Sequence, residues 1–168
     1  MASVHDAAAA IIERLGTVDN MKLQKLLFFA QGWSLAWRGV PMFDDNLEAW
    51  KKGPVVDSVY QTYKRHKWYP ISEPVRGDPS KLSDDERHIL TAVLDRYGRL
   101  NGRELSDITH DNPAWATAWS RRPHPKRSRQ VIDRQELVRS LRKGDSDGRL
   151  DVKAAEETLN KAFWGSKG

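Results

Sequence analysis

The segment that most constrains the fold is residues 21–38, MKLQKLLFFAQGWSLAWR. One set of small and apolar side chains recurs every three or four positions, as expected for one face of a helix: Leu23, Leu26, Leu27, Ala30, Ser34 and Trp37. Bulky apolar residues also occupy the rest of the circumference: Phe28, Phe29, Trp33 and Leu35. They leave a narrow polar strip of Lys22, Lys25, Gln31 and Arg38. A helix that is apolar around most of its girth belongs in the centre of a domain.

The rest of the chain predicts further helices around this one. Apolar spacing and capping signals predict helices over 2–15, 54–66, 83–97, 102–110, from 113 onward, 133–143 and 151–164. Ser83 and Glu86 form a capping box at the start of one of them. Short extended elements are expected near 46–52 and 68–76. We therefore predict a mostly α, compact single domain around the central helix, with a minor β element.

The positive charge is concentrated in one part of the chain. The formal net charge is +5, and residues 121–149 hold ten Lys/Arg against four Asp/Glu. The stretch RRPHPKRSR begins this region. It is either a solvated linker or a surface for phosphates or an acidic protein. We divide the chain into a domain over 1–143, which includes a basic connector at 121–130, and a C-terminal linker with an amphipathic helical extension at 144–168.

Motifs that carry chemistry are missing from the sequence. The chain has no cysteine, which excludes disulfides, thiolate metal sites and a cysteine nucleophile. It has no phosphate-binding loop, dinucleotide fingerprint, GxSxG or HExxH motif. Its five histidines are scattered along the chain without metal-ligand spacing. We expect no enzymatic activity, no cofactor and no metal. Without a membrane span or a secretory signal, we expect a cytoplasmic protein.

Three ordered motifs carry a family resemblance. MKLQKLLFFAQGWSLAWRGVPMF is followed by LEAWKKGPVVDSVYQTYK and then by LNGRELSDITHDNPAW. In this order they resemble the Panacea, or SocA-like, antitoxin domain, formerly a phage-associated domain of unknown function. The resemblance covers roughly residues 15–120.

The resemblance implies both a fold and a role. It implies a small helical domain that serves as the antitoxin of a two-gene toxin–antitoxin system, with a role in phage defence. Family members neutralise toxins by binding them, including alarmone-synthetase-like translation inhibitors, and some deliver a toxin to a protease. No catalytic residue or cofactor is implied. The expected partner is a cognate toxin protein, and the chain is expected to form a homodimer or a hetero-oligomer with the toxin.

The resemblance also marks residues, most of them with structural roles. The first motif contains Lys22, Leu23, Gln24, Lys25 and Leu26. The second contains Trp50, Gly53, Pro54, Val55 and Tyr60, and the third contains His110, Pro113 and Trp115. We expect Gly53 and Pro54 to form a corner that turns the chain from an extended segment into a helix. Trp50 is expected to pack against the central helix at this corner.

Partner-binding residues are expected on loops and on the C-terminal extension, because variable surfaces lie on segments that a packed core supports. The candidates are Trp68, Tyr69, Arg121, Arg122, Lys126, Arg127, Leu159, Phe163 and Trp164. The last three belong to an apolar stripe of the helix predicted at 151–164. This stripe is expected to pack on its own domain or in a groove on the toxin.

Two other functions stay open. Residues 101–122 have the length of a helix–turn–helix and precede the basic connector, which allows binding to operator DNA. The expected recognition helix, however, offers Ala, Trp and Thr instead of base-reading side chains. A hydrolase would use His110 with Asp107 or Asp111, but no nucleophile accompanies them.

Overall fold

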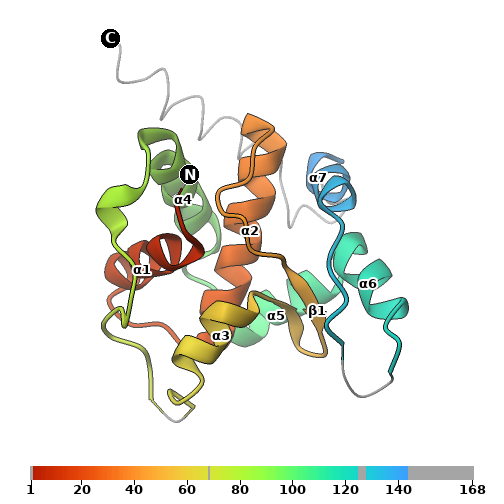
Figure 1. Ribbon diagram of the computed structural model, residues 1–168, viewed down its shortest axis with the longest axis horizontal. Helices are drawn as coiled ribbons and strands as arrows, with labels where there is room; N and C mark the ends of the chain where they lie inside the picture. Colours follow the sequence, from red (N-terminus) through yellow and green to blue (C-terminus); the bar gives the residue numbers. More distant parts are fainter. Residues whose placement is uncertain (1, 68, 125–127, 144–168) are drawn as a thin grey trace.

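The structure is a computed structural model that describes residues 2–67, 69–124 and 128–143. It confirms a mostly helical domain with a small antiparallel sheet (Figure 1). In chain order the helices and strands are α1 (Val4–Leu15), α2 (Asn20–Arg38), β1 (Glu48–Trp50), β2 (Gly53–Val55), α3 (Asp57–Tyr63), the 3-10 helix η1 (Pro79–Lys81), α4 (Asp84–Tyr97), α5 (Gly102–His110), α6 (Pro113–Ser120) and α7 (Arg134–Arg142). None of the helices in these ranges is long and apolar enough to cross a membrane.

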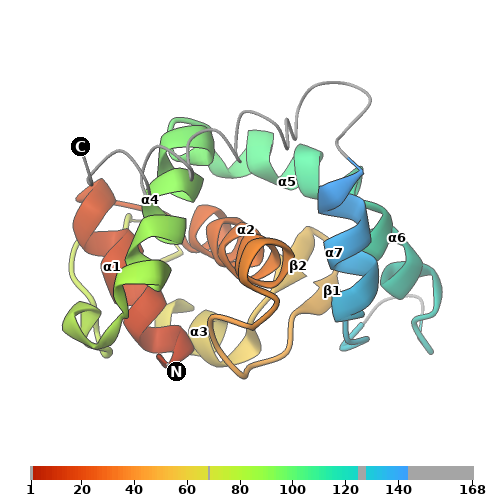
Figure 2. The same ribbon diagram turned by 90° about the horizontal axis from the view of Figure 1, so that it is seen from above.

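Helix α2 is the centre of the domain, as the sequence predicts. Figure 2 shows it end-on, surrounded by the other helices and the hairpin. Its residues 23–36 are all buried, and it contacts α1, α3, α4, α5, α7 and β2. The carboxylate of Asp19 accepts a hydrogen bond from the Lys22 amide at the start of the helix. Gly39, at φ 72°, ends it in the left-handed conformation.

Helices α1 and α4 cover one side of α2 (Figure 2). Each begins with a capping box, Ser3 with Asp6 and Ser83 with Glu86. The long loop between α3 and η1 crosses α1, where the Asp78 amide donates to the Asp6 carboxylate at 2.8 Å. Within the described part of this loop, the extended element expected near 68–76 is a single antiparallel bridge between Ile71 and Val18.

Strands β1 and β2 form a hairpin whose turn is Lys51-Lys52. The strands are antiparallel, with Glu48 opposite Val55 and Trp50 opposite Gly53. The prediction that Gly53 and Pro54 form the corner into a helix was therefore wrong. They belong to β2, and the helix predicted from residue 54 begins at Asp57. Proline is compatible with this strand because it lies at the edge of the sheet, where its nitrogen needs no partner.

The basic connector returns to the hairpin before α7 begins. The Ala49 amide donates to the Gln130 carbonyl and the Ile132 amide to the Leu47 carbonyl, both at 2.8 Å. Helix α7 then packs on α2, where Leu137 and Leu141 are fully buried. Helix α7 confirms the prediction for 133–143, and the helix predicted at 151–164 lies outside the described residues.

The close approach of α7 to α2 occurs at Gly32. A Cβ at this position would lie 2.5 Å from Leu141 Cδ1. We expect Gly32→Val to lower the free energy of unfolding by about 1–3 kcal/mol, because the added side chain overpacks this contact. Denaturant unfolding of the full chain measures the loss.

Leu141→Ala provides the control for this contact. If the valine at position 32 clashes with Leu141, the double variant Gly32→Val/Leu141→Ala should lose less stability than the sum of the losses of the two single variants. The shorter side chain at position 141 leaves room for the valine. Additive losses would show that Gly32 does not set the distance between α2 and α7.

Candidate functional site

Four polar side chains of α2 are buried and bind main-chain groups of neighbouring segments: Gln24, Lys25, Gln31 and Ser34. Lys25 and Gln31 are each 1% exposed, although the sequence predicts them on a polar strip. Gln31 accepts hydrogen bonds from the Met42 and Phe43 amides and donates to the Phe43 carbonyl. Burying a polar group costs free energy unless its hydrogen bonds are made. These bonds therefore fix the loop after α2 to the helix.

Gln24 and Lys25 hold strand β2. The Gln24 side-chain oxygen accepts from the Val56 amide at 2.9 Å, and Lys25 Nζ donates to the Pro54 carbonyl at 3.1 Å. Gly53 has a φ of 116°, and a Cβ there would lie 2.6 Å from Lys25 Cε and 2.9 Å from Thr109 Oγ1. Glycine is required here because L side chains rarely adopt this backbone conformation and because Lys25 and Thr109 fill the space.

Three side chains from α5 and α6 hold the turn of the hairpin from the other side. Ser106 Oγ donates to the Lys52 carbonyl at 2.7 Å. His110 Nε2 donates to the Lys51 carbonyl at 2.8 Å. Trp115 Nε1 donates to the Trp50 carbonyl at 3.0 Å, and its ring meets the His110 ring edge to face at 4.5 Å.

The three sequence motifs thus converge on one hairpin. Five side chains bind the main chain of the hairpin, and we call them the hairpin clasp: Gln24, Lys25, Ser106, His110 and Trp115. They bind four carbonyls of residues 50–54 and the amide of Val56. The first motif supplies two of these side chains, the third supplies three, and the second is the hairpin itself. These side-chain groups of the clasp bind the main chain of the hairpin. The arrangement therefore makes a rigid structural element.

The outer side of the hairpin carries the aromatic residues of the second motif. Trp50 and Tyr60 are half-buried, and their rings meet edge to face at 4.9 Å. Ala49 is the β1 residue that is fully buried in the core, and the packing of Trp50 against the central helix stays a prediction. Side chains alternate along a strand, which places Trp50 and Glu48 on the opposite face from Ala49. Burial raises the pKa of the Glu48 carboxyl, although a hydrogen bond from Trp50 opposes this.

The remaining motif residues are structural parts of the helices. Leu23 and Leu26 are fully buried, and Lys22 Nζ donates to the Gly98 carbonyl at 2.6 Å. Pro113 is the first residue of α6, after the Asn112 cap. Val55 is a buried residue of β2.

The predicted partner-binding residues are only partly described. Tyr69 is 58% exposed, Arg121 is exposed, and Arg122 covers the Trp119 ring at 4.0 Å. The others lie outside the described residues: Trp68, Lys126, Arg127, Leu159, Phe163 and Trp164.

The sequence prediction missed three structural residues: Ser106 of the clasp, Thr109, which lies against Gly53, and Gln31, which holds the loop after α2. A signal for Ser106 does exist. It lies four residues before His110, and this spacing places both side chains on one face of a helix. No local pattern identifies the backbone carbonyls that the side chains bind, because those lie more than fifty residues away along the chain.

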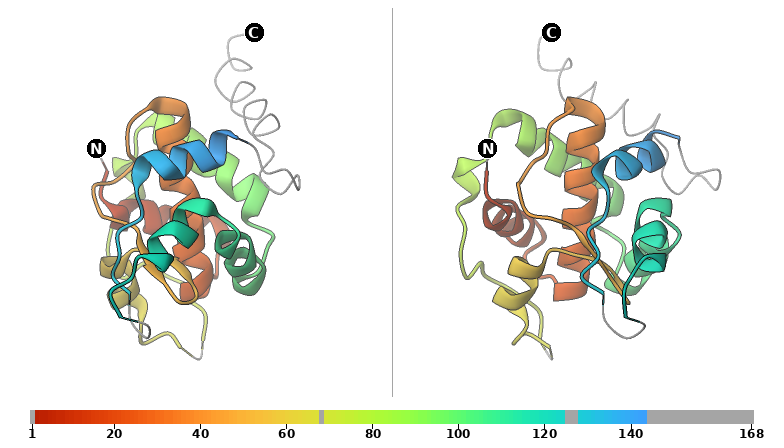
Figure 3. Two further views of the ribbon diagram at one scale, coloured as in Figure 1. Left: turned by 90° about the vertical axis from the view of Figure 1, so that its right-hand side faces the viewer. Right: turned by 45° about the vertical axis from the view of Figure 1, so that its right-hand side comes forward.

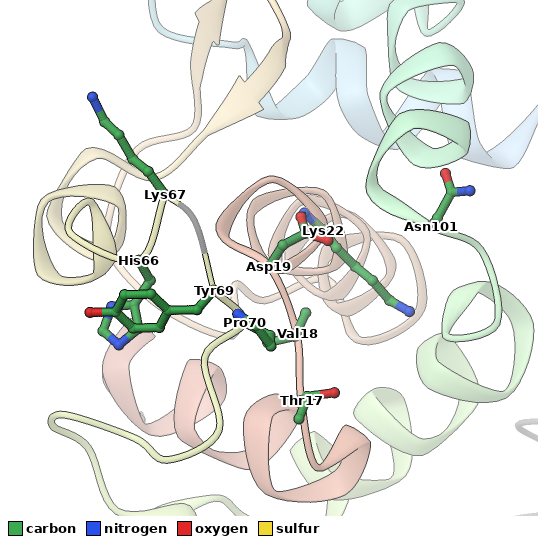
Figure 4. A pocket seen from close by; sticks show the side chains of 9 residues that line it. All are labelled: Thr17, Val18, Asp19, Lys22, His66, Lys67, Tyr69, Pro70 and Asn101. Atoms are coloured by element: carbon green, nitrogen blue, oxygen red, sulfur yellow. The ribbon is translucent and has the colours of Figure 1, made fainter.

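A surface pocket of about 390 Å³ lies between the start of α2 and the loop after α3 (Figure 4). Its lining includes Asp19, Lys22, His66 and Tyr69. Figure 4 shows the side chains of Lys22 and Lys67 pointing in opposite directions, so they do not converge on a common point. The described residues also contain no group of three His, Asp or Glu side chains suited to a metal ion.

We expect Gly53→Ala to destabilise the protein by about 3 kcal/mol. The estimate combines the strain of a β-carbon at positive φ with the clash against Lys25 and Thr109. Gly16→Ala is the matched control, since Gly16 also has a positive φ, of 78°, but an added Cβ there has no atom within 4 Å. It should cost about 1–2 kcal/mol. Equal losses in thermal or denaturant unfolding would show that the clasp does not need the space at Gly53.

Burial lowers the pKa of Lys25 from 10.5 to about 7, with a smaller effect in the same direction from Lys52 and an opposing one from Asp19. In the unfolded chain the amine keeps its proton up to about pH 10.5, so between pH 7 and 10.5 the unfolded state binds more protons. Stability should therefore rise with pH across this window, by at most about 1.4 kcal/mol per pH unit.

Lys25→Met should remove this contribution. The difference in unfolding free energy between the wild type and Lys25→Met is expected to increase from pH 7 to pH 10.5, as measured by denaturant titrations at several pH values. Lys22→Met is the control, because Lys22 also donates to a carbonyl yet is only half-buried. If the unfolding free energies of the wild type and Lys25→Met changed in parallel with pH, Lys25 would not cause this pH dependence.

Comparison with known proteins agrees with the motifs. Residues 23–116 match the model of the family described as antitoxin SocA-like, Panacea domain. A curated relative, antitoxin SocA of Caulobacter vibrioides (strain NA1000 / CB15N), is 32% identical over 103 residues. The match covers 55% of this chain and 55% of the relative, so the chain spans about half of the relative's length. No solved structure matches significantly. The chain belongs to the SocA-like antitoxin family with a Panacea domain.

Proposed function

We propose that this protein is the antitoxin of a two-gene toxin–antitoxin system and neutralises its toxin by direct binding in the cytoplasm. The observation that carries the proposal is the match to the SocA-like antitoxin family over residues 23–116, which include most of the first motif and all of the other two. Membership of an antitoxin family indicates a non-catalytic role. The resemblance of the motifs favours an alarmone-synthetase-like translation inhibitor as the toxin and phage defence as the setting.

The geometry of the clasp supports a binding role. His110, the candidate base of a hydrolase, donates to the Lys51 main-chain carbonyl and packs on Trp115. Lys25, the most deeply buried amine of the described residues, is held against the Pro54 carbonyl. Groups that would have to act on a substrate are instead used to fix a hairpin. A protein that neutralises a partner needs such a rigid scaffold, because a preorganised surface loses less entropy on binding.

Co-expression tests the proposal. The gene that adjoins the one for this chain is induced alone and together with it, and growth is followed. The adjoining gene is expected to stop growth by itself and to permit it when this protein is present. The two proteins should then co-elute as a complex in size-exclusion chromatography.

A frameshifted copy of this chain's gene is the control, because it leaves the transcript almost unchanged while removing the protein. Rescue by the frameshifted copy would mean that RNA neutralises the toxin. Growth arrest that persists beside the intact protein, or an adjoining gene that is harmless alone, would overturn the proposal.

A further inference from the structure

Three basic loops gather at one end of the domain. The hairpin turn, the loop after α3 and the connector between α6 and α7 all lie at the lower end of the molecule in Figure 1 and in both views of Figure 3. We define the basic end by eight Lys and Arg residues of these loops: Lys51, Lys52, Lys64, Arg65, Lys67, Arg121, Arg122 and Arg129. Residues 61–72 and 121–132 contain no Asp or Glu.

Direct contacts join these loops into one surface. The Trp50 ring of β1 meets Tyr60 of α3 at 4.9 Å. Arg129 of the connector forms an ion pair with Asp57 at the start of α3, at 3.4 Å. The Ala49 amide binds the Gln130 carbonyl, which holds the connector beside β1. The basic residues are therefore supported by one packed set of elements.

Basic side chains outnumber acidic ones in these three loops. Acidic side chains also lie in or beside these loops, among them Glu48, Asp57, Glu73, Asp107 and Asp111, and Asp19 lines a pocket together with Lys67. Asp57 is paired with Arg129. Within the described residues Lys51 and Lys52 form no ion pair, and both are exposed. Such a surface attracts an acidic partner and repels a basic one.

Aromatic side chains lie among these charges. Tyr69 is 58% exposed, and Trp50, Tyr60 and Trp119 are half-buried. Trp, Tyr and Arg are the residue types that contribute most to binding energy in protein interfaces. The ring of Trp119 is stacked on Trp115 and covered by the Arg122 guanidinium at 4.0 Å, so it offers little open face to a nucleobase.

The arrangement favours a protein over a nucleic acid. The basic residues lie on loops around an end of the domain and not along a helix that could enter a groove of DNA. The hairpin clasp fixes the main chain under Lys51 and Lys52, so these side chains are presented from a rigid base. We propose that the basic end is the toxin-binding surface and that it recognises an acidic patch with an apolar centre on the toxin. This inference rests on the proposed function.

Charge reversal at the hairpin turn tests the surface. Lys51→Glu/Lys52→Glu changes two exposed side chains, while the carbonyls that the clasp binds belong to the backbone and remain. The binding partner in the assay is the purified product of the adjoining gene, titrated with full-length protein at low and at high salt. The variant should bind at least about tenfold more weakly, through slower association, and its binding should depend less on salt.

Lys81→Glu/Arg139→Glu is the matched control. Both residues are exposed, they lie on η1 and α7 away from the basic end, and the change in net charge is the same. This control should bind like the wild type. Thermal melting of all variants checks the fold, and a second variant, Lys64→Glu/Arg65→Glu, tests another loop of the basic end if the hairpin variant melts early.

The outcomes distinguish this inference from the proposed function. If both basic-end variants bind with wild-type affinity and still rescue growth, the basic end is not the toxin-binding surface. The antitoxin role would remain supported. Equal loss in Lys81→Glu/Arg139→Glu would mean that net charge alone matters and would also overturn it. Failure of the wild type to bind the adjoining product would refute both. Salt-sensitive binding of duplex DNA or single-stranded RNA that only the basic-end variants lose, without an effect on toxin binding, would assign the surface to nucleic acid.

Discussion

The structure depends on hydrogen bonds from buried polar side chains of the central helix to the backbone of the segments around it. Gln24, Lys25 and Gln31 each occupy a position that apolar packing alone would give to a leucine. A buried amide or amine without a partner would cost several kcal/mol, so each of them specifies which main-chain group must lie beside it. The hydrophobic core makes α2 central, whereas its polar residues decide how the hairpin and the following loop attach to it.

This attachment also solves a problem of the small sheet. A two-stranded hairpin is marginally stable alone, and an edge strand exposes unpaired groups that invite association with other chains. Here the Pro54 carbonyl and the Val56 amide, on the side of β2 away from β1, are occupied by Lys25 and Gln24. The connector pairs with the other side of the hairpin through Gln130 and Ile132. Both sides are thereby closed within the described part of the chain.

Local patterns in the sequence predicted the helices well, because a helix is specified by the spacing and caps within its own residues. The capping box of α4 and the apolar period of α2 are examples. The clasp could not be predicted in this way. Its bonds join residues 29 to 65 positions apart, and the lack of space for a side chain at Gly53 comes from Lys25 and Thr109, which are distant in sequence. The sequence indicated that Gly53 and Pro54 change the direction of the chain, but it suggested a turn where the structure has a strand.

The clasp has a consequence for specificity. Its contacts at the turn are made to the carbonyls of Trp50, Lys51 and Lys52, which every amino acid possesses, and not to their side chains. The side chains at the tip of the hairpin can therefore change without disturbing the bonds that hold it. A scaffold of this kind separates the residues that maintain the fold from those that meet a partner. Under the proposed function, the charge and shape of the basic end would then be free to vary with the toxin while Gly53, Lys25 and His110 stay the same.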